Sequence, residues 1–255
     1  DGAYARILNE GRITADNIAL VASSVRNDGI IAAQAGTAHL ASGDKVAVSF
    51  DPRGMIQVAI NEETSGQVVD LDGKTVKDAV ANAGSIEARE VVMSSKTAAD
   101  IFVNAINQTG VVRATGMTEE GGVIRIRSNR NVQVSGELEA PQGGISVSTD
   151  ESISVTSELK TIGNTEVTAN KDIDVTASIE TSDGNLSLIA DADLDGIGAF
   201  KQAEGTHIAT LHSGDITIQA SGASALANVS SAGDFTLRQG GSQVAFSQQP
   251  DSSVS

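Results

Sequence analysis

The residues of this sequence best suited to bind a metal ion are three aspartates, Asp191, Asp193 and Asp195. They alternate with apolar residues and a glycine follows the third, as in the first half of a D-x-D-x-D-G calcium loop. Position twelve of such a loop carries a bidentate Glu, whereas this chain has Gln202 there. Two interpretations follow, a calcium site on the three aspartates or an acidic turn without metal, and no other cofactor is predicted.

Other groups that could perform catalysis lack the necessary spacing. The histidines His39, His207 and His212 are not spaced as metal ligands, and His39 is expected on the solvent face of a strand because its neighbours are apolar. S-x-x-K matches begin at Ser42 and Ser157, but they lie in strand and turn sequence, and that motif needs a helical turn. We therefore predict no catalytic residues and no enzyme.

Composition excludes several classes of function. The net charge of −16 opposes binding to nucleic acid and to anionic lipid. The chain has no cysteine, so disulfides and thiolate metal sites are impossible. Aromatic residues make up only 2% and tryptophan is absent, so platforms for sugar rings are nearly missing. No apolar run is long enough to insert into a membrane.

A repeat of roughly 20 residues organises the chain, and its clearest copy is residues 143–161. Alternation of apolar and polar residues places the apolar ones on one face of a strand. Glycines precede similar runs at Gly122, Gly144, Gly163, Gly184, Gly214 and Gly233. Within the clearest copy, the residues expected to point inward are Ile145, Val147, Ile153, Val155 and Leu159.

Three short strands per period of roughly 20 residues predict an all-β fold, a parallel β-helix with three strands per turn. About 12 such turns, about 4.8 Å apart, would give a rod about 55 Å long. Early turns begin with Asn-x-Gly, as at Asn9 and Asn27, which we interpret as turns in the left-handed conformation.

Several segments interrupt the period. Residues 51–81 are expected to leave the coil as an excursion with a hairpin and a partial helical turn. Residues 94–106 have helical spacing of apolar residues and predict a short helix. Residues 191–205 form an enlarged loop, and 247–255 a polar tail. Specific function is expected at the interruptions, because the polar positions of the regular repeats form a solvent face.

The stretches ILNEGRITADNIALVASSVRNDGIIAAQAGTAHLASGDKVAVSF, GMIQVAINEE and GSIEAREVVMSSKTAADIFVNAINQTGVVRAT occur in this order. Together they resemble filamentous-haemagglutinin-type exoproteins of the two-partner secretion pathway, over roughly residues 5–130. The resemblance implies a right-handed β-helix, secreted across a Gram-negative outer membrane by a partner transporter. The Asn-Pro-Asn-Gly motifs of the family's secretion domain are absent and would lie upstream of Asp1, so transporter contact is expected through an upstream region.

We accordingly divide the chain into residues 1–130, the later part of a secretion-domain-like β-helix, and 131–246, regular β-helix repeats. The expected function is that of a secreted or cell-surface adhesin segment, a rigid rod that presents a binding surface or distal domains. Expected partners are the outer-membrane transporter, a receptor or glycan on a host or neighbouring cell, and a second copy bound end to end. The alternatives are a β-helical polysaccharide-degrading enzyme and a self-assembling extracellular fibre subunit.

Overall fold

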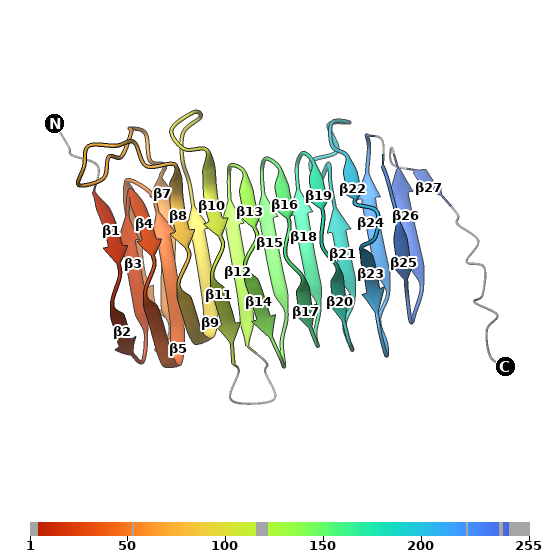
Figure 1. The fold of residues 1–255 in the computed structure, drawn as a ribbon, viewed down its shortest axis with the longest axis horizontal. Helices are drawn as coiled ribbons and strands as arrows, with labels where there is room; N and C mark the ends of the chain where they lie inside the picture. The colour runs from red at the N-terminus through yellow and green to blue at the C-terminus, as the bar shows by residue number, and fades with distance from the viewer. Residues whose placement is uncertain (1–4, 53, 116–121, 223, 240–241, 245–255) are drawn as a thin grey trace.

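The computed structural model describes residues 5–52, 54–115, 122–222, 224–239 and 242–244. Every regular element in these ranges is a β-strand, and the ranges contain no helix. Figure 1 shows the strands stacked side by side from β1 at one end to β27 at the other. The fold is therefore all-β and built on large parallel sheets.

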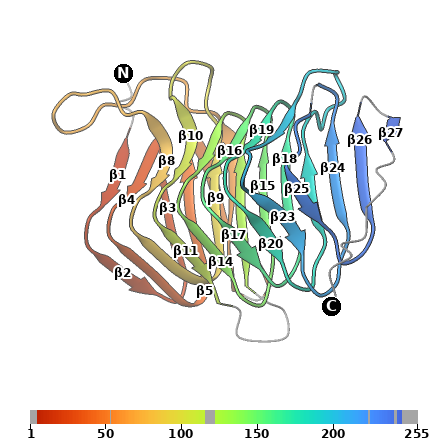
Figure 2. The same cartoon turned by 45° about the vertical axis from the view of Figure 1, so that its right-hand side comes forward.

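The strands form three rows, and within each row neighbouring strands pair in parallel (Figure 2). Row one comprises β1 (Arg6–Asn9), β4 (Ser24–Asn27), β8 (Asp78–Asn82), β10 (Asn104–Gln108), β13 (Val132–Val134), β16 (Ile153–Val155), β19 (Ile173–Val175) and β22 (Phe200–Gln202). Two long strands, β5 (Ile30–Ser42) and β9 (Ser85–Ser95), run through both of the other rows.

Row two comprises β2 (Arg12–Ala15), the first parts of β5 and β9, β11 (Val111–Ala114), β14 (Glu137–Ala140), β17 (Leu159–Thr161), β20 (Ile179–Thr181), β23 (His207–Thr210) and β25 (Asn228–Ser230). Row three comprises β3 (Ile18–Ala22), the later parts of β5 and β9, β12 (Val123–Ser128), β15 (Ile145–Thr149), β18 (Thr165–Ala169), β21 (Leu186–Ile189), β24 (Ile216–Ala220) and β26 (Phe235–Gln239). β27 (Ser242–Val244) pairs antiparallel with β26.

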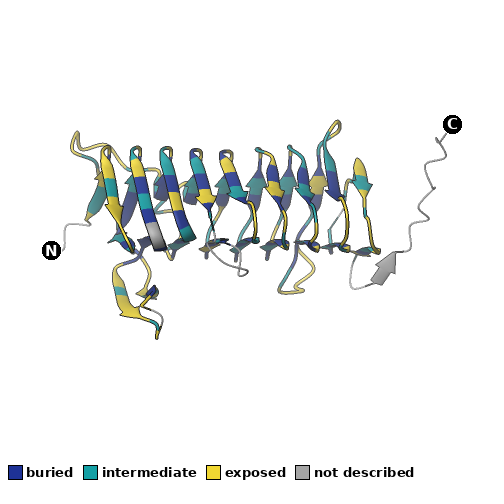
Figure 3. Cartoon of the chain, turned by 90° about the horizontal axis from the view of Figure 1, so that it is seen from below, coloured by how far each residue is buried: buried dark blue, intermediate teal, exposed yellow. Residues whose placement is uncertain are grey.

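The interior between the rows is filled by aliphatic side chains in register. Val155 of β16, for example, lies between Val134 of β13 and Val175 of β19, and all three are buried. Buried and exposed residues alternate along the strands, as the colouring of Figure 3 shows. The inward positions predicted from the repeat are confirmed: the exposed fraction is at most 2% for Ile145, Val147, Ile153, Val155 and Leu159.

The stack is shorter than the sequence suggested. Row three holds nine parallel strands within the described residues, so eight spacings of about 4.8 Å give about 38 Å rather than about 55 Å. The difference arises because long segments lie outside the rows. Residues 43–77 separate β5 from β8, although these strands belong to adjacent levels of the stack.

The short helix predicted over residues 94–106 is wrong. β9 continues to Ser95, Thr97 forms a bridge with Thr64, and β10 begins at Asn104. The side chain of Asn129 holds this segment, since its Oδ1 accepts from the N–H of Thr97 at 2.9 Å and its Nδ2 donates to the carbonyl of Thr97 at 3.0 Å. The residues that suggested a helical face are divided between two elements: Ala98, Ile101 and Phe102 lie in the connection after β9, and Ala105 and Ile106 lie on β10.

The excursion contains an antiparallel hairpin, β6 (Lys45–Phe50) and β7 (Ile56–Glu62). Its register places Val46, Val48 and Phe50 opposite Ile60, Val58 and Ile56, so these six side chains form an apolar face of the hairpin. Ile56 is buried, whereas Val48 and Phe50 are 51% and 69% exposed. Beyond the hairpin, residues 63–77 form bridges and turns and no helical turn.

Two features explain the early Asn-x-Gly turns, and neither is a left-handed glycine. Asn9, Asn27, Asn82 and Gln108 end successive strands of row one and point inward as a buried ladder of side-chain amides. The Nδ2 of each asparagine donates to the next side-chain oxygen at 2.7–2.8 Å. Glycine follows because the turns stack closely: a Cβ on Gly84 would overlap the carbonyl oxygen of Gly29.

His39 is buried, so its predicted position on the solvent face is wrong. It does point away from the aliphatic interior, since its neighbours Ala38 and Leu40 point inward. The hairpin, however, covers this outer face and leaves His39 only 6% exposed, with Nδ1 lacking a hydrogen-bond partner. Burial lowers the pKa of His39 from 6.5 to about 4, although a hydrogen bond with the backbone of Ile56 acts in the opposite direction.

This histidine should make the fold sensitive to acid. Between pH 6.5 and about 4 the unfolded chain binds a proton that folded His39 does not. The free energy of unfolding should therefore fall by about 3 kcal/mol as the pH drops through this window, and be fully restored above it. Urea unfolding at several pH values measures how steeply the free energy of unfolding depends on pH, here called the slope. His39→Gln should flatten the slope, whereas His212→Gln, which changes an exposed histidine, should leave it unchanged; equal slopes in all three proteins would contradict the assignment.

Candidate functional site

The three aspartates lie together on the loop between β21 and β22. Each of Asp191, Asp193 and Asp195 can place one carboxylate oxygen within 4.8 Å of the others. Asp191 is buried with a φ of 55°, whereas Asp193 and Asp195 are exposed. The structure therefore gathers the predicted residues on an irregular loop at the surface of the stack.

Contacts within the protein already occupy Asp191. Its carboxylate accepts hydrogen bonds from the hydroxyl of Ser221 and from the N–H of Gly196, the latter at 3.2 Å. Burial alone would raise the pKa of Asp191, but these hydrogen bonds outweigh burial and lower it. Asp195 Oδ1 similarly accepts from the N–H of Ile197 at 2.7 Å. These bonds close the loop upon itself.

Gln202 does not complete a calcium loop. It lies on β22 with its side chain buried, and its Nε2 donates to the carbonyls of Thr206 and Asn228 at 3.1 and 2.9 Å. The calcium hypothesis therefore depends on the three carboxylates alone. If they bind calcium, millimolar calcium should raise the melting temperature, and Asp193→Asn should abolish the rise. No calorimetric heat and no change in melting temperature would reject it.

Two of the remaining candidate groups, His207 and His212, lie beside carboxylates, and His207 is also hydrogen-bonded to a hydroxyl. His207 contacts Glu180 and Ser178, and His212 lies 3.7 Å from Asp183. The S-x-x-K pairs are separated. Ser42 Oγ donates to the carbonyl of Ser23 at 2.8 Å while Lys45 pairs with Glu62 at 3.1 Å, and Ser157 donates to the carbonyl of Gly136 while Lys160 pairs with Glu158.

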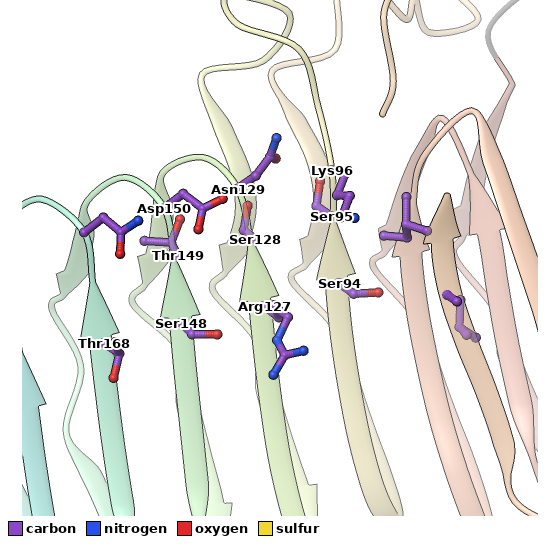
Figure 4. A pocket seen from close by; sticks show the side chains of 14 residues that line it. Ser94, Ser95, Lys96, Arg127, Ser128, Asn129, Ser148, Thr149, Asp150 and Thr168 are labelled. Carbon is purple, nitrogen blue, oxygen red and sulfur yellow. The ribbon is translucent and has the colours of Figure 1, made fainter. Parts of the chain in front are cut away.

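A groove of about 540 Å³ lies where the hairpin meets row three. Its apolar wall is formed by Val58, Ala59 and Ile60 of β7. Its floor is formed by polar side chains of four successive strands, Ser94, Arg127, Ser148 and Thr168, which occupy equivalent register positions. Figure 4 shows these four side chains at the same height on neighbouring strands. The upper rim is formed by Lys96, Asn129, Asp150 and Asn170.

This groove was not predicted from the sequence, because the polar positions of the repeats were assigned to solvent. Arg127, Ser148 and Thr168 are outward residues of their strands, which alternation predicts correctly. Alternation does not show that an extra hairpin rises beside them. The available signal was a polar residue at the same position in consecutive repeats next to an interruption of the period.

Comparison with family models, with curated proteins and with solved structures gave no match for this chain. Within the described residues, no helix has the length and hydrophobicity needed to cross a bilayer.

Proposed function

We propose that this chain is a section of a right-handed parallel β-helix that acts as a rigid rod in a secreted or cell-surface adhesin. The rod presents a binding surface or holds distal domains away from the cell. The observation that supports this function is the parallel pairing of each strand with its equivalent in the next repeat, along three rows with one continuous interior. Such a stack resists bending, because every level is bonded to the next through its backbone.

The outer face of row two supports the same function. Along consecutive strands its outward residues alternate in charge, in the order Glu87, Arg113, Glu139, Lys160 and Glu180. Arg113 forms an ion pair with Glu139. Exposed pairs contribute only about 0–1 kcal/mol each. Their alternation nevertheless avoids like charges on adjacent strands in a chain whose net charge is −16.

The alternative of a polysaccharide-degrading enzyme is less well supported. A general acid needs a carboxyl group with a raised pKa. The pKa of Glu151 is instead lowered, first by its hydrogen bond with Lys171 and also by Arg130, against the opposing effect of burial. Asp172 accepts from the N–H of Ala199 at 2.8 Å. These carboxylates stabilise the turns of the stack.

The fibre alternative requires free strand edges at the ends of the rows. The antiparallel strand β27 pairs with β26 and so covers the edge of row three at that end. This pairing disfavours addition of a second copy to row three there, whereas β1, β2 and β3 at the other end pair on one side only within the described residues. The rod function depends on neither edge and is therefore the one we propose.

Labelling of intact cells tests the proposal. An antibody raised against this chain should bind intact cells of the source organism, or detect the protein in the medium, without permeabilisation. Export should depend on an outer-membrane transporter. Small-angle scattering of the purified chain should also show an elongated particle. Labelling that appears only after permeabilisation, or a spherical particle, would contradict the proposed function.

A further inference from the structure

Two cations in the groove lack partners within the described part of the chain. Arg125 pairs with Glu90, and Arg130 lies 3.0 Å from Glu151. Between them in sequence, Arg127 has neither an ion pair nor a hydrogen bond to a described residue, and the same holds for the ammonium group of Lys96. In a chain with a net charge of −16, two uncompensated cations in one groove make it a local site for an anion.

Hydroxyl groups flank Arg127 on both adjacent strands. Ser94 of β9 and Ser148 of β15 are its register neighbours, about 4.8 Å away along the stack. The Oγ of Ser94 is buried and has no hydrogen-bond partner. Because this atom is covered, it can reach a ligand oxygen only after the side chain rotates, and such a contact would remove the cost of an unpaired buried hydroxyl. A guanidinium between two hydroxyls can bind a planar carboxylate with two hydrogen bonds.

The rest of the groove suits a sugar. The backbones of β12 and β15 are paired on both sides, so the floor can contact a ligand only through side chains. Asp150 and Asn170 at the rim offer oxygens and an amide to hydroxyl groups. Val58 and Ile60 provide an aliphatic wall for the C–H face of a ring. The volume of about 540 Å³ is that of a small-molecule site, large enough for a few sugar units.

We propose that this groove binds an acidic oligosaccharide and that Arg127, flanked by Ser94 and Ser148, holds a uronate carboxylate. The carboxylate of Asp150 and the overall negative charge oppose a long polyanion such as nucleic acid, so a short ligand with few carboxylates is favoured. The inference rests on the proposed adhesin function and deepens it, because it names the class of ligand that the surface of the rod would bind.

Calorimetric titration with short oligogalacturonate tests the inference at physiological ionic strength. We expect saturable binding by the wild-type chain and at least about a tenfold weaker affinity for Arg127→Ala. Arg125→Ala is the matched control, since it removes the same charge two residues away on the same strand and should keep the affinity within about twofold. Arg127→Lys should bind with intermediate affinity, because it retains the charge without the fork of donors.

The ligand series decides the chemistry. The same oligosaccharide with its carboxylates reduced to alcohols should bind at least about tenfold more weakly. The inference would be overturned if the wild-type chain bound no oligogalacturonate, or bound the reduced sugar equally well. It would also be overturned if Arg125→Ala lost as much affinity as Arg127→Ala, or if the wild-type chain preferred a sulfated galactan or oligoglutamate. Cell-surface labelling separates this outcome from the proposed function: a labelled surface with no oligogalacturonate binding overturns the ligand alone, and an intracellular protein overturns the adhesin function.

Discussion

Val155→Asp is expected to prevent folding at room temperature. Val155 lies in the interior between Val134 and Val175 and has no exposed surface. The substitution removes the burial of a valine, worth about 1.5–3 kcal/mol, and places a carboxyl group among aliphatic side chains at a cost of several kcal/mol. The sum approaches or exceeds the total free energy of unfolding of an ordinary domain, about 5–15 kcal/mol. Circular dichroism should show the loss of β-structure.

The adjacent position supplies the control. Ser154→Asp introduces the same charge on the same strand, but this side chain points outward. Its register neighbours are Gln133 and Asp174, so repulsion from one exposed carboxylate should cost less than about 1 kcal/mol. A folded Val155→Asp protein with an unchanged melting temperature would show that β16 is turned the other way, and would refute the inward assignment of the whole repeat.

Sequence periodicity predicted the regular part of this fold because every repeat buries its apolar residues in the same way. A strand such as Ile153–Val155 has one face, and that face can be buried only against the equivalent strands of adjacent repeats. Spacing and alternation therefore determine which residues pair and which point inward. The same information cannot give the length of the stack, since a segment such as residues 43–77 is absent from the rows.

Errors arose where contact with another segment, rather than the local pattern, determines the environment. The period alone cannot show that a hairpin covers His39. In segment 94–106, hydrogen bonds from the side chain of Asn129 hold an extended conformation in place of the predicted helix. The candidate sites divide in the same way. The three aspartates are close in sequence and were found, although Gln202 turned inward. The groove around Arg127 is lined by residues of four strands and of the hairpin. These residues are far apart in sequence, so only the folded chain brings them together.

The amide ladder provides the second large effect, and Asn82 is one of its two inner members. Its Oδ1 accepts from Asn27 and its Nδ2 donates to Gln108 at 2.8 Å, and all three side chains have no exposed surface. Asn82→Ala leaves the buried Oε1 of Gln108 without a donor, whereas the Nδ2 of Asn27 keeps its longer bonds to the carbonyls of Gly29 and Ser85 at 3.3 and 3.4 Å. The unsatisfied acceptor costs about 1–3 kcal/mol and the cavity adds to this, so we expect the free energy of unfolding to fall by about 3 kcal/mol.

Urea unfolding of Asn82→Ala measures this loss, and Asn61→Ala provides the matched control. Asn61 is exposed on β7, and its replacement should change the free energy of unfolding by no more than about 0.5 kcal/mol. Asn82→Leu sharpens the test, because leucine fills a similar volume but cannot bond either neighbour. If hydrogen bonding rather than packing stabilises this corner, leucine should be about as damaging as alanine. Recovery of stability by leucine would mean that the corner needs only filling, and that the amides serve to fix the register of the stacked turns.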